Sequence, residues 1–158
     1  MQKITPCLWF DDQAEAAASY YTSIFKNSRI LEVARYGEAG PRPAGMVMTV
    51  TFELDGQQFV ALNGGPEFTF NEAISFQIDC ASQDEVDEMW QRLSDGGEPG
   101  PCGWLKDRFG VSWQVVPTVL KDLMSDPDPE KSTRVMAAML KMSKIDIAAL
   151  RAAHEGSG

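Results

Sequence analysis

The stretch that decides the fold is Ser75-Phe76-Gln77-Ile78-Asp79-Cys80, an alternating run that predicts a β-strand and leads into Ser82. Glu85 follows Ser82 by three positions. This spacing is typical of a helix start, because the short side chain accepts a backbone N–H and the acid faces the helix dipole. The run Thr5-Pro6-Cys7-Leu8-Trp9-Phe10 leads in the same way into Asp12 and Glu15, about seventy residues earlier. The sequence therefore contains the same strand-and-helix unit twice.

The two helices that should follow these starts share one apolar pattern. Both place apolar residues at positions i, i+3, i+4 and i+7, the spacing of a helix with one buried face. The first set is Ala17, Tyr20, Tyr21 and Ile24, and the second is Val86, Met89, Trp90 and Leu93. The capping pair, the apolar spacing and the order of strand and helix all recur in both halves. Together they predict a duplicated module.

Three further strands are predicted after each helix. In the first half they are 29–36, 47–54 and 57–63, with Asp55-Gly56 as a hairpin turn. In the second half they are 98–101, 103–107 and 111–116, with a turn at Arg108-Phe109-Gly110. The sequence thus predicts an α+β fold in a single domain, 1–158, with one βαβββ module over 1–66 and another over 72–117.

Residues 118–158 are predicted to form a helical annex. One helix should run from Val119 to Ser125, another should open at Asp128-Pro129, and a third should follow Asp146. Its apolar face includes Met136 and Met139. Such a face is usually intramolecular core or a dimer contact, and less often a ligand-binding surface.

Composition limits the partners and the chemistry. The 158 residues are 44% hydrophobic and 23% charged, as in an ordinary globular protein. A net charge of −9 argues against nucleic acid, and no apolar run could span a membrane or resembles a signal peptide. We therefore expect a cytoplasmic protein with reduced thiols, in which Cys7 and Cys80 are small buried hydrophobes. The only histidine, His154, lies near the end of the chain and is expected to be solvated.

Strand alternation indicates which side chains face away from the helices. These side chains should line a concave cleft with an apolar wall and a few hydrogen-bonding groups, as a small-molecule pocket requires. Alternatively, the polar groups satisfy one another or meet water. The candidate ligand-binding residues are Thr5, Trp9, Leu62, Ser75, Gln77, Trp104 and Gln114.

The segment from Cys102 to Gln114, with Lys106-Asp107-Arg108-Phe109-Gly110 at its centre, resembles the PhnB-like branch of the vicinal oxygen chelate superfamily. That superfamily includes glyoxalase I, bleomycin-resistance proteins and extradiol dioxygenases. Gly64-Gly65-Pro66 also fits the branch, whose members are often labelled 3-demethylubiquinone-9 3-methyltransferase-like. The resemblance implies the vicinal oxygen chelate fold and a homodimer.

Metal-dependent members of the superfamily take His and Glu ligands from their first, fourth, fifth and eighth strands. By the same resemblance, those positions here are Thr5, Val60, Ser75 and Gln114. Neutral hydroxyls, one amide and an alkyl group would not repay the dehydration of a divalent ion. No metal and no cofactor is therefore predicted.

Other catalytic arrangements lack a residue that they need. His154 is remote from every strand, so a Ser-His-Asp or Cys-His site has no base, and no glycine-rich nucleotide loop follows a strand. We therefore expect metal-independent binding of a small, partly apolar molecule in the cleft. The alternative is an enzyme of the superfamily, of the metal-dependent lyase or dioxygenase type or 3-demethylubiquinone-9 3-methyltransferase-like. A purely structural protein would instead show a filled cleft. The sequence does not identify the ligand.

Overall fold

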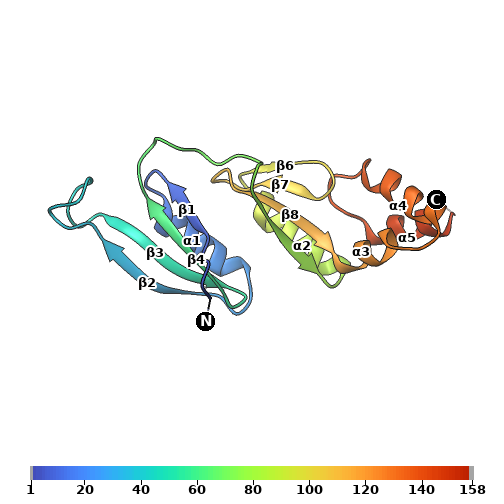
Figure 1. Ribbon diagram of the computed structural model, residues 1–158, viewed down its shortest axis with the longest axis horizontal. Coiled ribbons are helices and arrows are strands. Elements are labelled where there is room, and N and C mark those ends of the chain that lie inside the picture. The colour runs from blue at the N-terminus through green and yellow to red at the C-terminus, as the bar shows by residue number, and fades with distance from the viewer. Residues whose placement is uncertain (1, 157–158) are drawn as a thin grey trace. The chain divides into compact units, whose positions relative to one another are not determined.

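The structure, a computed structural model, describes residues 2–156 and divides into two compact units after Phe70. Unit 1 holds the first strand-and-helix motif and three further strands (Figure 1). Its elements are β1 (Cys7–Phe10), α1 (Ala14–Ile24), β2 (Arg29–Arg35), β3 (Val47–Leu54) and β4 (Gln57–Asn63). The βαβββ order predicted for the first half is confirmed.

The four strands of unit 1 form sheet A in the order β1-β4-β3-β2. β1 runs parallel to β4, whereas β3 is antiparallel to both of its neighbours. Helix α1 covers one face of this sheet, where Leu8, Phe10, Phe52 and Phe59 are buried with Tyr21 of the helix. Each such large apolar side chain contributes about 1.5–3 kcal/mol when it leaves water. This core fixes which face of sheet A lies away from α1.

The start of α1 corrects one prediction. Asp12 does not cap the helix, because the N-cap residue is Gln13 and its side chain makes no cap hydrogen bond. Instead Asn63, at the end of β4, accepts a hydrogen bond from the Ala14 amide through Oδ1 at 2.8 Å. The Asn63 amide group donates to the Val47 carbonyl at 3.0 Å. A buried side chain far along the sequence thus replaces the local cap.

Unit 2 repeats the motif and adds the annex (Figure 1). Ser82 accepts a hydrogen bond from the Glu85 amide at 3.2 Å, so the second predicted cap is confirmed. Sheet B has the strand order β5-β8-β7-β6, with β5 parallel to β8, which is the arrangement of sheet A again. The elements are β5 (Ser75–Cys80), α2 (Gln83–Ser94), β6 (Glu98–Pro99), β7 (Trp104–Lys106) and β8 (Ser112–Pro117).

The turn between β7 and β8 is organised by Asp107, whose side chain is buried. Its Oδ1 accepts hydrogen bonds from the amides of Phe109 and Val111, at 2.8 and 3.1 Å. Its Oδ2 accepts from Trp113 Nε1 at 2.8 Å. One carboxylate therefore ties the turn to an indole in the core between sheet B and α2.

The annex consists of α3 (Thr118–Met124), α4 (Pro129–Met139) and α5 (Ile147–Glu155). Leu123, Val135, Ile145 and Leu150 form its core, and Met139 and Met142 pack against them. The annex is joined to the rest of unit 2 through Gln83 of α2. The Gln83 side chain donates to the Ile145 carbonyl at 3.0 Å and accepts from the Ile147 amide at 2.8 Å. Part of the methionine-bearing face is therefore intramolecular core.

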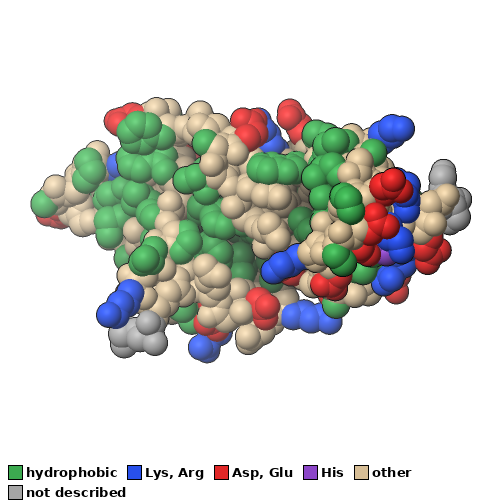
Figure 2. Space-filling view, turned by 45° about the vertical axis from the view of Figure 1, so that its right-hand side comes forward, with side chains coloured by type: hydrophobic (Ala, Val, Ile, Leu, Met, Phe, Trp, Pro, Cys, Tyr) green, Lys and Arg blue, Asp and Glu red, His purple; other side chains and the backbone are tan. Residues whose placement is uncertain are grey.

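His154 is not a solvated tail residue, which corrects a second prediction. Its Nε2 lies 2.7 Å from Asp126 Oδ2, and its side chain is largely buried. Arg134 of α4 donates to the carbonyls of Ala153 and His154, both at 2.8 Å. These contacts hold the end of α5 to α4 and to the turn before it. Acidic and basic side chains are interspersed over this part of the surface (Figure 2).

Within residues 2–156, no helix combines the length and the apolar character that a membrane crossing requires.

Replacing Asp107 by Asn should lower the free energy of unfolding by about 2 kcal/mol, because an amide nitrogen would face the buried indole N–H of Trp113. Urea denaturation measures the loss. Asp95→Asn is the matched control: Asp95 pairs with Arg108 in solvent, so its change should stay below about 0.5 kcal/mol. Equal effects of the two variants would show that Asp107 does not organise the turn.

Acid should loosen the annex. Hydrogen bonds from Lys144 and then Gln83 lower the pKa of Asp87 from 3.8, and the Asp128 amide followed by His154 lowers that of Asp126. A carboxylate with a lowered folded-state pKa stabilises the fold above its unfolded-state pKa. That contribution is lost as the pH falls through the folded-state value.

Urea midpoints measured between about pH 5 and about pH 2 test this. They should fall less steeply for Asp87→Asn/Asp126→Asn than for the unsubstituted protein. Asp122→Asn, at an exposed position of α3, should keep the original slope. A double variant with an unchanged slope would contradict the assignment.

Candidate functional site

The first candidate surface is the face of sheet A opposite α1, here called face A. It consists of Cys7 and Trp9 of β1, Val60 and Leu62 of β4, and Thr49 and Thr51 of β3. The register places Trp9 beside Leu62, and Thr49 beside Leu62 on the other side. The predicted apolar pair is therefore brought together. Thr5 lies just before β1, where it is half-buried.

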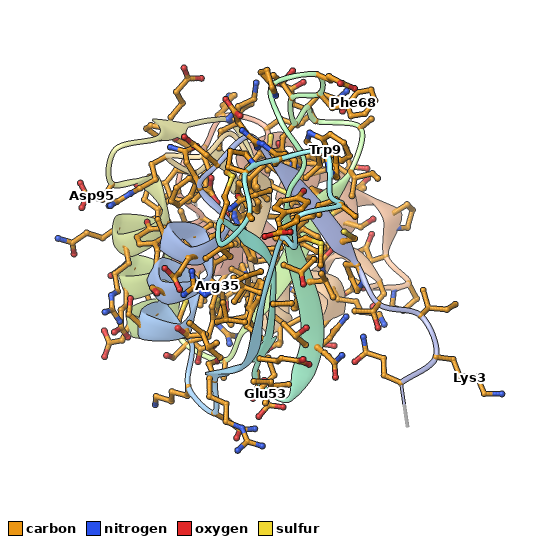
Figure 3. All side chains as sticks on the ribbon, turned by 90° about the vertical axis from the view of Figure 1, so that its left-hand side faces the viewer. Lys3, Trp9, Arg35, Glu53, Phe68 and Asp95 are labelled. Carbon is orange, nitrogen blue, oxygen red and sulfur yellow. The ribbon has the colours of Figure 1, made fainter. Side chains whose placement is uncertain are left out.

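Trp9 is held in one orientation by three contacts within unit 1. Its Nε1 donates to the Gly65 carbonyl at 2.9 Å. Its ring lies against Gly64 so closely that a Cβ there would be 2.4 Å from a ring carbon. Phe68 meets the ring edge-on, with centroids 4.9 Å apart, and the two residues lie together at one end of unit 1 (Figure 3). Trp9 is a fixed aromatic wall whose N–H is already used.

Cys7 corrects a third prediction, because it lies on face A and is exposed rather than buried. Its environment still raises the pKa of the thiol through desolvation, so Cys7 is protonated at neutral pH and is a poor nucleophile. Cys80 is buried as predicted, and burial with the charges of Glu85 and Asp79 raises its pKa to about 12. The structure offers neither thiol as an activated group.

The second candidate surface is the face of sheet B opposite α2, here called face B. Two rows of side chains cross it in register. One row is Gln77, Gln114 and Trp104, and the other is Ser75, Ser112 and Lys106. Gln114 joins the rows, since its Nε2 donates to Ser75 Oγ at 2.9 Å. Four of the predicted ligand-binding residues, Ser75, Gln77, Trp104 and Gln114, thus share one surface.

The polar groups of face B partly satisfy one another. Gln77 is exposed and donates to Asp79 Oδ1 at 3.0 Å, whereas Gln114 is half-buried and bonded to Ser75. The alternative that these groups satisfy one another or meet water therefore applies in part to both residues, since Gln114 is bonded to Ser75 and Gln77 is exposed. The Gln114 carbonyl oxygen and the Ser75 hydroxyl proton remain chemically suited to a ligand.

Three further residues bear on these surfaces but are not among the predicted ligand-binding residues. Ser112 is 1% exposed, and its Oγ has no hydrogen-bond partner among the described residues. Glu72, in the segment before β5, forms an ion pair with Lys106. Phe68 is 62% exposed although it packs on Trp9. Strand parity already placed Ser112 on face B, but no local pattern signals the positions of Glu72 and Phe68.

The residues at the superfamily's metal positions do not fit a divalent ion. Val60 has no donor atom, and Thr5 and Ser75 offer neutral hydroxyls. Gln114 already donates to Ser75, which orients its amide group. Within residues 2–156, no group of three or more His, Cys, Asp or Glu side chains could hold a metal. The donor set of these faces suits hydrogen bonding to an organic molecule better than metal coordination.

A family model described as 3-demethylubiquinone-9 3-methyltransferase matches residues 2–116. Among solved structures, a PhnB protein from Bacillus cereus is 36% identical, with a TM-score of 0.67; the match covers 74% of this chain and 100% of that one. Comparison with curated proteins found no match.

Two more distant structures share the fold. PA1353 from Pseudomonas aeruginosa is 21% identical, covers 74% of this chain and 98% of its own, and has a TM-score of 0.61. The fosfomycin resistance protein FosX from Listeria monocytogenes is 16% identical, with a TM-score of 0.53. That match covers 77% of this chain and 97% of FosX. Together with the repeated βαβββ sheets, these matches confirm the vicinal oxygen chelate fold. This chain belongs to the 3-demethylubiquinone-9 3-methyltransferase family, in the PhnB-like branch of the vicinal oxygen chelate superfamily.

Proposed function

We propose that this protein binds a small, partly apolar organic molecule on its helix-free sheet faces, without a metal ion. The observation that carries the proposal is the chemistry of those faces. Face A offers the fixed ring of Trp9 beside Leu62, and face B offers Trp104 beside Gln114 and Ser75. A few hydrogen-bonding groups on an apolar surface are typical of small-molecule sites. A cytoplasmic homodimer belongs to the same proposal.

Rigid placement of Trp9 supports this function. A side chain already fixed by Gly64, Gly65 and Phe68 loses little conformational entropy when a ligand contacts it. The indole N–H is used within unit 1, so Trp9 supplies apolar contact area and no donor. On face B, Gln114 and Ser75 are the polar groups that could give directional recognition.

The second candidate is an enzyme of the family, which the description of the matching family model favours. Its chemistry would need either a metal or S-adenosylmethionine. Face A and face B carry a donor set that does not suit a divalent ion, and the sequence has no glycine-rich loop for an adenosyl cofactor. Binding without chemistry therefore fits the described side chains better.

Benzamide, a neutral ring with one amide, is a suitable probe of the proposed function. In an NMR titration, each face is followed separately, and saturable shifts should be concentrated at the amides of Trp9 and Leu62 on face A and of Gln114 on face B. Trp104→Phe should weaken binding by about threefold, because it removes contact area from face B. Trp90→Phe is the matched control, since Trp90 lies on α2 and should leave binding unchanged.

Scattered or unsaturable shifts would contradict the proposal. So would a stoichiometric divalent metal, found by elemental analysis of protein purified without chelator. A dose-dependent rise in melting temperature with S-adenosylmethionine would favour the enzyme instead.

Gly64→Ala should displace the Trp9 ring, because the new methyl group would overlap it. We expect a loss of about 1–3 kcal/mol in the free energy of unfolding and a shifted Trp9 indole N–H resonance. Gly37→Ala is the control, since a Cβ at Gly37 meets nothing within 4 Å. An indole resonance that does not move in Gly64→Ala would mean that Gly64 does not position the wall.

A further inference from the structure

Face B contains a buried hydroxyl that its own fold leaves without a partner. Ser112 begins β8, and its side chain is flanked in register by Ser75 of β5 and Lys106 of β7. Only 1% of Ser112 is exposed, and its Oγ has no hydrogen-bond partner among the described residues. A serine hydroxyl can donate one hydrogen bond and accept two, and burying it unpaired costs about 1–3 kcal/mol. Such a cost points to a partner that comes from outside the chain.

A cation lies next to this hydroxyl in the same row. Lys106 forms an ion pair with Glu72, and their side chains are 36% and 59% exposed. Glu72 raises the pKa of Lys106, and Lys106 in turn lowers that of Glu72, so both groups are charged at neutral pH. Glu98, opposite Lys106 on β6, adds a second nearby carboxylate. The structure thus places an ammonium group where carboxylates already gather.

The Lys106–Glu72 ion pair is suited to exchange the Glu72 carboxylate for a carboxylate of a ligand. Glu72 lies three residues before Ser75, on the segment that enters β5, whereas Lys106 belongs to β7 on the other side of Ser112. The pair therefore connects the two segments that flank the start of β8. Exposed ion pairs contribute only about 0–1 kcal/mol. A ligand carboxylate that also met the Ser112 hydroxyl would make two charge-assisted contacts in place of one.

We propose that Lys106 and Ser112 form an anion subsite on face B, in which a ligand carboxylate displaces Glu72 from Lys106 Nζ and accepts a hydrogen bond from Ser112 Oγ. The inference rests on the proposed function and narrows the ligand class to small organic acids with an apolar body. Trp104, in the adjoining row, would contact that body, and Gln114 would offer its carbonyl oxygen.

Benzoate and benzamide test the subsite, because they share a ring and differ in charge. Both are titrated by NMR into the unsubstituted protein, three variants of face B and one control variant. Lys106→Gln should weaken benzoate binding by about tenfold, and Ser112→Ala by about threefold without loss of thermal stability. Glu72→Gln should strengthen it by about threefold, since a competing carboxylate is removed. Benzamide affinity should change by less than twofold in each.

Lys144→Gln is the matched control. It also removes one positive charge and one ion pair, with Asp87, but Lys144 lies outside face B. Its benzoate affinity should stay that of the unsubstituted protein. If Lys144→Gln and Lys106→Gln weakened benzoate binding equally, the loss would come from the change in net charge alone. That result would overturn the subsite.

The two proposals fail in different ways. If benzamide binds on the faces but benzoate binds no better, or if Glu72→Gln weakens benzoate as Lys106→Gln does, the anion subsite is wrong and the proposed function stands. If neither probe gives saturable shifts on faces A and B, both are wrong.

Discussion

The parallel pairing of the first and last strand in each sheet is the constraint on which both candidate surfaces depend. Each pair stands next to the helix-covered core, so every second residue of both strands is committed to that core. The remaining residues must meet on the other face. Trp9 lies beside Leu62, and Gln77 beside Gln114, for this reason. A slip of one residue would exchange core and surface throughout a sheet.

Polar side chains at the ends of the strands hold this register in place. Asn63 joins the end of β4 to the start of α1, and Asp107 joins the β7–β8 turn to Trp113. Both are buried and use their oxygens on backbone amides or an indole, which compensates for the loss of hydration. Ser112 is the exception, because its hydroxyl is buried and unpartnered within the described residues. Unlike Asn63 and Asp107, Ser112 therefore has an unused hydroxyl with which to hydrogen-bond a ligand.

Much of the fold could be predicted from the sequence. Period-two alternation and the Asp55-Gly56 turn predicted β3 and β4 with the bounds observed, and Ser82 caps α2 as expected. Predictions failed where a distant residue intervened. Asn63 caps α1 in place of Asp12, and Asp126 pairs with His154 near the end of the chain. The position of Cys7 within a strand predicts a buried thiol, but its side chain lies on face A, where it is exposed.

The sequence by itself determined the duplicated βαβββ order and the face on which each strand residue lies, because both follow from local periodicity. Only the tertiary structure decided which of those side chains have partners. It fixed Trp9 through Gly64 and Gly65, joined Gln114 to Ser75, and set Glu72 against Lys106. Such pairs depend on strand register and on the paths of connecting segments. Both are set by the packing of the whole unit, which no short stretch of sequence encodes.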